Sequence, residues 1–133
     1  MSELRPTVLV VDDEPAVRAI TRRGLMLSGF DVLLAADGLS AIRVLQATDH
    51  PPVRLVITDI RMPGMSGDDL GRLLHHTQPS LPVLYMSGYS MPELGFLPAD
   101  DMRRCWLEKP FTMHELAEKV RGLLSADTRL IGA

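Results

Sequence analysis

Short aliphatic runs alternate along the chain with segments of helical periodicity, and this alternation constrains the fold more than any other feature of the sequence. Each run is rich in Val, Ile and Leu, which is typical of strands buried on both faces of a parallel sheet. The runs are TVLVV (7–11), DVLLAA (31–36), RLVIT (54–58), PVLYM (82–86) and CWLE (105–108). Strands that alternate with helices predict right-handed crossovers and a doubly wound α/β fold, with helices on both faces of the sheet.

The segments between the runs differ in how clearly they predict helices. Apolar spacing favours helices over 15–28, 38–48, 68–77 and 113–125. Pro15 is a favourable first residue for the first of them. The last is the clearest, because Thr112 and Glu115 form a capping box ahead of its apolar stripe. A helix over 90–101 is doubtful, since this segment contains two prolines and a glycine.

Length, charge and cysteine content limit the classes of function. The 133 residues suffice for one domain with a core and are too few for two ordinary domains. A net charge of −3 argues against a surface that binds nucleic acid. No apolar run approaches the roughly 18 residues of a membrane span, and no signal peptide precedes the first run. With a single cysteine and no disulfide framework, we expect a cytoplasmic protein that binds neither nucleic acid nor membrane.

Polar side chains follow the aliphatic runs, at the sheet edge where doubly wound folds bind their ligands. They are Asp12, Asp13 and Glu14 after the first run, Asp37 after the second, Asp59 after the third, Ser87 and Gly88 after the fourth, and Lys109 and Pro110 after the fifth. Two carboxylates about 4 Å apart repel by about 4 kcal/mol at an effective dielectric constant near 20. Such a cluster must raise a pKa or bind cations, and Mg²⁺ is the usual ion where few carboxylates meet a phosphate.

Asp59 is suited to act as a nucleophile towards phosphorus if it stands on a rigid strand end beside a metal ion and Lys109. Phosphoryl transfer requires mainly positioning and charge neutralisation from the protein. An aspartyl phosphate is a known type of covalent intermediate. The hydroxyl of Ser87 and the ammonium of Lys109 could then bind the phosphoryl oxygens.

Four motifs, each at the end of a predicted strand, give the chain a specific family resemblance. They are VLVVDDEP (8–15), LVITDIRMPGMSG (55–67), VLYMSGY (83–89) and WLEKPF (106–111). Over residues 6–125 the chain closely resembles the receiver domain of bacterial two-component response regulators. The resemblance implies a flavodoxin-like (βα)5 fold with strand order 2-1-3-4-5. It also implies a receiver domain over 7–125, with tails at 1–6 and 126–133.

The resemblance implies a metal-assisted phosphorylation site. Asp59 matches the phosphoacceptor of the family. Asp13, Asp59 and the backbone carbonyl of Arg61 match the direct ligands of Mg²⁺, for which Mn²⁺ could substitute. Asp12 matches the companion acid, which acts through metal-bound water.

A second set of residues matches the positions that bind the phosphoryl group and respond to it. Ser87 and Lys109 match the residues that contact the phosphoryl oxygens, and Gly88 stands where the family usually has alanine. The bond between Lys109 and Pro110 is expected to be cis. Trp106 stands at the aromatic switch position, where Tyr or Phe is usual, so this ring belongs either to the core or to the switch.

The resemblance implies a signalling module that is not an enzyme beyond its own phosphorylation and autodephosphorylation. A sensor histidine kinase or a histidine phosphotransfer protein would donate the phosphoryl group. An output protein would bind a face formed by the fourth helix, the fifth strand and the fifth helix. About eight residues follow the last predicted helix, too few for a DNA-binding domain, and Met1 favours a stand-alone receiver. The segments YMSGYS (85–90) and EKPFT (108–112) resemble receiver domains that are attached to hybrid sensor kinases. The alternative is therefore a receiver that acts as a phosphoryl sink or relay.

Two other classes of protein share parts of the pattern. A flavodoxin-type cofactor carrier needs a loop rich in Ser, Thr and Gly after the first strand, and DDEPA at 12–16 would repel a phosphate. A Mg²⁺-dependent phosphatase of the haloacid dehalogenase type carries a DxD motif there, but residues 12–14 read Asp-Asp-Glu. A metal site at His75 and His76 is not expected, because adjacent helical side chains do not face each other.

Overall fold

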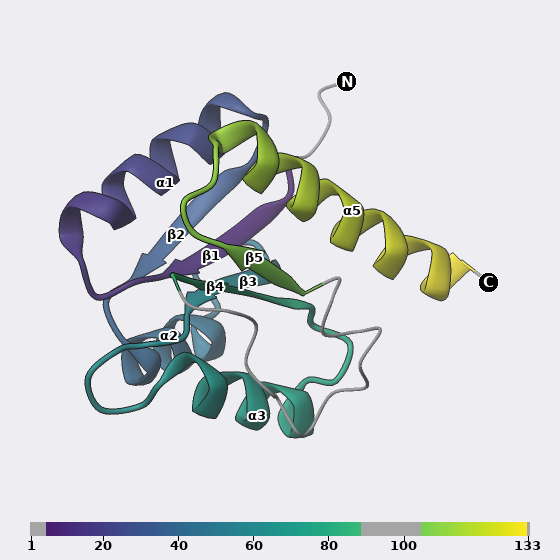
Figure 1. Ribbon diagram of the computed structural model, residues 1–133. Coiled ribbons are helices and arrows are strands. Elements are labelled where there is room, and N and C mark those ends of the chain that lie inside the picture. Colours follow the sequence, from purple (N-terminus) through teal and green to yellow (C-terminus); the bar gives the residue numbers. More distant parts are fainter. Residues whose placement is uncertain (1–4, 89–104, 133) are drawn as a thin grey trace.

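The computed structural model describes residues 5–88 and 105–132, with side chains described as far as residue 125. Five parallel strands form one sheet in the order β2-β1-β3-β4-β5 (Figure 1). The strands are β1 (Thr7–Val11), β2 (Asp31–Ala35), β3 (Val53–Asp59), β4 (Val83–Ser87) and β5 (Trp106–Glu108). The predicted doubly wound fold and its strand order are thus confirmed. The doubtful helix over 90–101 lies outside the described residues.

Helices cover both faces of the sheet, α1 and α5 on one side and α2 and α3 on the other (Figure 1). Their bounds are α1 (Pro15–Leu27), α2 (Gly38–Gln46), α3 (Gly67–Thr77) and α5 (Met113–Gly132). Helix α5 runs past its predicted end at residue 125. The sequence SADTRLI that follows Leu124 contains neither proline nor glycine, so nothing in it stops a helix before Gly132. The division into a domain over 7–125 and two tails stays a prediction.

At the starts of α2, α3 and α5, capping side chains satisfy free backbone N–H groups of the first turn. The side chains of Asp37 and Ser66 accept hydrogen bonds from first-turn amides of α2 and α3. The predicted capping box is confirmed. The amide of Thr112 donates to the Glu115 carboxylate over 2.7 Å, and the amide of Glu115 donates to the Thr112 hydroxyl over 3.0 Å. These caps fix where the chain turns at the carboxyl end of the sheet.

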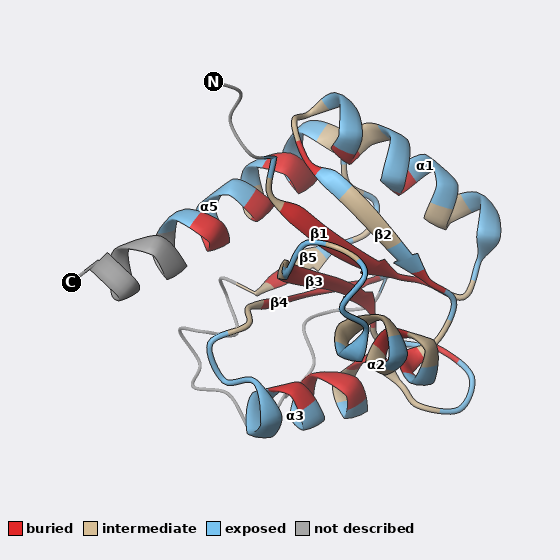
Figure 2. Ribbon diagram, turned by 180° about the vertical axis from the view of Figure 1, so that it is seen from behind, coloured by how far each residue is buried: buried red, intermediate tan, exposed pale blue. Residues whose placement is uncertain are grey.

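The core consists of two layers, one on each face of the sheet. Residues of β1 alternate between them, Val8 and Val10 packing towards α1 and α5, and Leu9 and Val11 towards α2 and α3. Buried residues follow the three central strands (Figure 2). The strands that carry the site therefore belong to the best-packed part of the molecule.

Strand β2 differs from the expectation that every run is buried on both faces. It lies at the edge of the sheet and has only β1 as a neighbour. Asp31 and Leu34 are exposed, and Ala35 is the one buried residue of this strand. An aliphatic run alone does not distinguish an edge strand from a central one.

Strand β3 begins with an irregularity. Thr7 of β1 pairs with Val53, whereas the next residue, Val8, pairs with Leu55. Arg54 therefore has no partner in the β1 ladder, and its side chain is exposed. From Leu55 onward the pairing is regular as far as Thr58, one residue before Asp59.

Candidate functional site

Adjacent strands bring the polar residues of the site to one edge of the sheet. Asp59 and Ser87 are the last residues of β3 and β4, so each belongs to its strand and not to the loop after it. Backbone hydrogen bonds hold the chain next to these two residues in place. The amide of Ile60 donates to the carbonyl of Met86 over 3.1 Å, and that of Lys109 donates to the carbonyl of Ser87 over 2.7 Å. The position of each site residue is thus set by sheet register.

Three carboxylates meet at this edge. Asp12, Asp13 and Asp59 each offer an oxygen, and these oxygens lie within 4.8 Å of one another. Asp12 is fully buried and Asp59 is 8% exposed, whereas Asp13 is half-buried. The structure therefore brings together the three acids that the sequence analysis assigned to metal binding.

Asp12 is held on several sides but keeps one unsatisfied oxygen. Its amide donates to the carbonyl of Ala35 over 3.1 Å, and its Oδ1 accepts from the amide of Glu14 over 2.9 Å. Its Oδ2 is buried and has no hydrogen-bond partner among the described residues. Burial raises the pKa of Asp12, and the negative charges of Asp59 and Asp13 add to this effect.

Lys109 provides a positive charge at the site. Its Nζ lies 3.3 Å from Oδ2 of Asp59, and both side chains are largely buried. The peptide bond from Lys109 to Pro110 is cis. Within the part of the chain that the structure describes, one ammonium does not balance three carboxylates, and an oxygen of Asp12 lacks a hydrogen-bond partner. These hard oxygen donors and the uncompensated charge fit Mg²⁺ or Mn²⁺.

The remaining residues of the phosphoryl-binding set differ in their surroundings. Ser87 is 4% exposed, whereas Gly88 is exposed, and a Cβ atom added there would meet no described residue within 4 Å. Trp106 is buried in the hydrophobic layer that faces α2 and α3.

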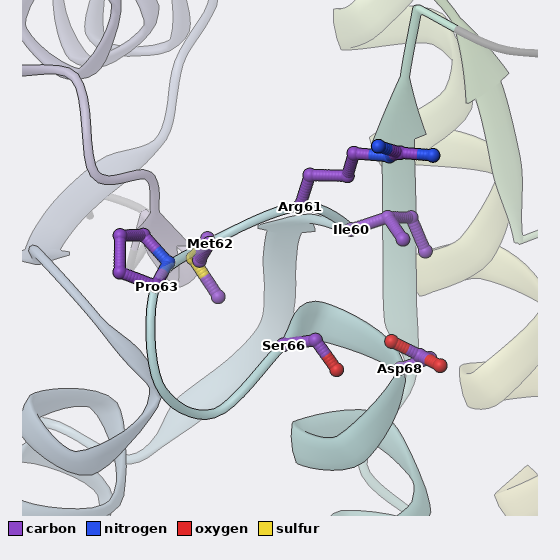
Figure 3. A pocket seen from close by; sticks show the side chains of 6 residues that line it. All are labelled: Ile60, Arg61, Met62, Pro63, Ser66 and Asp68. Carbon is purple, nitrogen blue, oxygen red and sulfur yellow. The ribbon is translucent and has the colours of Figure 1, made fainter.

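Arg61 is exposed on the loop between β3 and α3. This loop borders an open depression of about 580 Å³ (Figure 3). Its described lining consists of Ile60, Arg61, Met62, Pro63, Ser66 and Asp68. The three clustered carboxylates are not part of that lining, so the depression and the acid cluster are different features of the surface.

Two residues that support Asp59 were missed in the sequence. Thr58 is fully buried, and its hydroxyl donates to the carbonyl oxygen of Asp59 over 2.9 Å. Gly67 approaches the same group so closely that a Cβ atom on it would overlap this carbonyl oxygen, and its amide donates to the carbonyl of Ile60 over 2.8 Å. The glycine at the end of the PGMSG stretch was the available signal, but its partner becomes visible only in three dimensions.

The family can now be assigned. The family model of the response regulator receiver domain matches residues 8–121. The chain belongs to this family. Receiver domains are signalling modules of two-component systems and are not classically enzymes. In the described part of this receiver domain, no helix combines the length and apolar character needed to cross a membrane.

Relatives of this receiver domain include bacterial regulators and a kinase. It is 36% identical over 126 residues to the response regulator MprA of Mycolicibacterium vanbaalenii, covering 95% of this chain and 53% of MprA. It is 37% identical over 119 residues to the sensor kinase CckA of Brucella abortus, covering 89% of this chain and 12% of CckA. The structure of response regulator TrrA from Thermotoga maritima in complex with Mg²⁺-BeF matches with a TM-score of 0.72 and 27% identity, covering 89% of this chain and 98% of TrrA. The chain spans about half the length of MprA and a small part of CckA.

Proposed function

We propose that this receiver domain accepts a phosphoryl group on Asp59 from a phosphohistidine of a sensor histidine kinase or a histidine phosphotransfer protein. The observation that carries the proposal is the meeting of three carboxylates within 4.8 Å, with Lys109 on Asp59 and one buried oxygen of Asp12 that no described residue contacts by a hydrogen bond. This arrangement is costly without a cation and suited to phosphate chemistry with one. Membership of the receiver family supports the same role.

Asp13, Asp59 and the backbone carbonyl of Arg61 would hold Mg²⁺ or Mn²⁺ directly, with Asp12 acting through water. When bound, the ion neutralises charge on the phosphoryl oxygens. The similar protein TrrA has been determined with Mg²⁺-BeF, which supports this assignment. The Oδ2 of Asp12, which has no hydrogen-bond partner among the described residues, would be available to such a water.

The chain's own residues account for the transfer step. A carboxylate oxygen of Asp59 forms the new bond to phosphorus, the bond from phosphorus to the histidine nitrogen breaks, and its electron pair stays on the imidazole. The position of Asp59 as the last residue of a buried strand fixes the direction from which it attacks. Lys109 and the Ser87 hydroxyl would then donate hydrogen bonds to the phosphoryl oxygens, and Gly88 leaves space for them.

The added charge would shift the population between two packings of the output face. This face would comprise β5 and α5, together with the segment expected to form a fourth helix, which lies outside the described residues. An output protein would bind there. Trp106, at one end of β5, would act as a switch only if phosphorylation changes its buried environment. We place this signalling in the cytoplasm.

A second candidate is the receiver of a hybrid kinase, acting as a phosphoryl sink or relay. The similarity to the sensor kinase CckA favours it. The two functions differ in the fate of the phosphoryl group. A relay returns it to a phosphotransfer histidine, so incubation of the phosphorylated domain with such a protein should transfer label; retention of label would favour a stand-alone regulator.

Intact-mass spectrometry tests the phosphorylation itself. Incubation with acetyl phosphate and Mg²⁺ should add one phosphoryl group to the protein, and EDTA should prevent the addition. Asp59→Asn should abolish it, whereas the exposed control Asp49→Asn should leave it unchanged. If Asp59→Asn gains the same mass at the same rate, the assignment of the phosphoacceptor is wrong.

A further inference from the structure

Arg18 contacts the backbone of the acid cluster from α1. It lies one turn into this helix, and its side chain is half-buried. Its Nη1 donates a hydrogen bond of 2.7 Å to the carbonyl oxygen of Asp12. Its backbone amide donates to the carbonyl of Glu14 over 2.9 Å. Hydrogen bonds therefore hold both the backbone and the guanidinium group of Arg18.

The carbonyl that Arg18 holds belongs to the peptide group between Asp12 and Asp13. A peptide group is planar, so fixing its oxygen also fixes the amide nitrogen of Asp13. The amide and Oδ1 of Asp12 already have partners in Ala35 and Glu14. The bond from Arg18 gives the carbonyl of Asp12 a partner as well, and it restrains the orientation from which the Asp13 side chain leaves the backbone.

A guanidinium group is well suited to this task. It stays charged at every physiological pH, and its planar donors form strong charge-assisted bonds. Its role differs from that of Lys109, whose Nζ contacts a carboxylate of the cluster directly. Arg18 instead contacts the main-chain carbonyl of Asp12.

We infer that Arg18 is a positioning residue of the divalent cation site, because its bond to the Asp12 carbonyl holds Asp12 and Asp13 in the geometry that binds Mg²⁺. The inference rests on the proposed function, which supplies the metal. Residues that orient metal ligands typically change metal affinity by about 10- to 100-fold when they are replaced. Arg18 holds a backbone group, so we expect the lower end of this range.

Calorimetric titration with Mg²⁺ tests the inference without any phosphoryl donor. Arg18→Met keeps most of the apolar stem and removes the donor, and should weaken Mg²⁺ binding about tenfold. Arg18→Lys keeps a charged donor and should recover part of the affinity. Arg22→Met is the matched control, because Arg22 is exposed on the same helix, and it should bind Mg²⁺ like the wild type.

Thermal unfolding in EDTA separates positioning from general stability. A purely structural role predicts a lower melting temperature with an unchanged Mg²⁺ dissociation constant, and this result would overturn the inference. Should Arg18→Met fail to unfold cooperatively, Arg18→Gln gives the same test, and wild-type affinity in a folded Arg18→Gln would also overturn it. If the wild type itself does not bind Mg²⁺, the proposed function fails, and the inference fails with it.

Discussion

The ammonium nitrogen of Lys109 lies 3.3 Å from a carboxylate oxygen of Asp59, although β4 lies between β3, which ends at Asp59, and β5, which precedes Lys109. The pair bridges the carboxyl edge of the sheet over one intervening strand. It thereby opposes the repulsion among Asp59, Asp12 and Asp13.

Replacing Lys109 with Met should therefore destabilise the metal-free protein. We expect the free energy of unfolding in EDTA to fall by about 1 kcal/mol, because Asp59 loses its partner in a largely buried site. Mg²⁺ binding should persist, since the carboxylates remain, and the phosphorylation-dependent change in partner affinity should disappear. Urea denaturation with and without Mg²⁺ measures the first effect, with the exposed Arg23→Met as control. Equal stability of Lys109→Met and the wild type in EDTA would contradict this role.

Asp12 should make the metal-free protein less stable as the pH rises. Burial raises the pKa of its carboxyl in the folded state above its ordinary value, so the folded state holds its proton to higher pH than the unfolded chain. Stability therefore falls as the pH rises from about the unfolded pKa through the folded one. Asp12→Asn keeps the Oδ1 acceptor for Glu14 and removes the charge, so in EDTA it should unfold at higher urea concentration than the wild type at pH 7.

The advantage of Asp12→Asn should vanish below the unfolded pKa, where the wild-type carboxyl is also neutral. Mg²⁺ should stabilise the wild type more than this variant. Asp49→Asn, a change at an exposed position, should show neither effect. A less stable Asp12→Asn at pH 7 without metal would show that the carboxylate is stabilised in the fold.

Gly67→Ala should damage the site, because its new methyl group would overlap the carbonyl of Asp59. We expect a loss of about 2 kcal/mol in stability and slower phosphorylation, since the end of β3 or the following loop must move. Gly122→Ala is the matched control on α5, where an added Cβ would meet no described residue within 4 Å. That change should stabilise the protein by about 0.5–1 kcal/mol through helix propensity. Wild-type stability and phosphorylation in Gly67→Ala would show that the loop adapts without cost.

His50 should contribute stability that is lost at alkaline pH. Its Nδ1 and Nε2 each lie 2.7 Å from a carbonyl oxygen, of Pro51 and Val44, and both contacts are hydrogen bonds only when the ring carries two protons. The carbonyl of Pro51, followed by that of Val44, raises the pKa of His50 above 6.5. The contribution is thus complete below pH 6.5 and lost as the pH rises through the folded pKa.

NMR titration of the imidazole checks the pKa of His50 directly, and a value at or below 6.5 would refute the double contact. His50→Gln should flatten the decline in stability between pH 6 and 9. His114→Gln changes an exposed histidine near the start of α5 and serves as the control. Neither variant should alter Mg²⁺ affinity.

The features that the sequence predicted depend on local pattern. Aliphatic runs defined the strands, and Thr112 with Glu115 defined a helix start, because strand burial and capping act over a few neighbouring residues. The meeting of Asp12, Asp13 and Asp59 was also predictable, since parallel strands place their carboxyl ends at one edge.

The features that could not be predicted depend on which distant groups approach one another. The hydrogen bond from Arg18 and the close approach of Gly67 both end on backbone carbonyls, which every residue possesses, so no side-chain pattern marks the partner. The exposure of Leu34 depends on the edge position of its strand, which the composition of the run does not encode. The roles of Ser87 and Trp106 in switching stay predictions.

The unpaired Arg54 at the beginning of β3 determines where this strand tolerates a change of length. Side chains along a strand point to alternate faces, so inserting or deleting one residue between Leu55 and Thr58 would turn the Asp59 carboxylate to the opposite side of the sheet. Deleting Arg54 would remove only the irregularity and leave the pairing from Leu55 to Thr58 intact. Single-residue deletions along β3 should therefore abolish Mg²⁺ binding at every position in this regular stretch and spare it at Arg54.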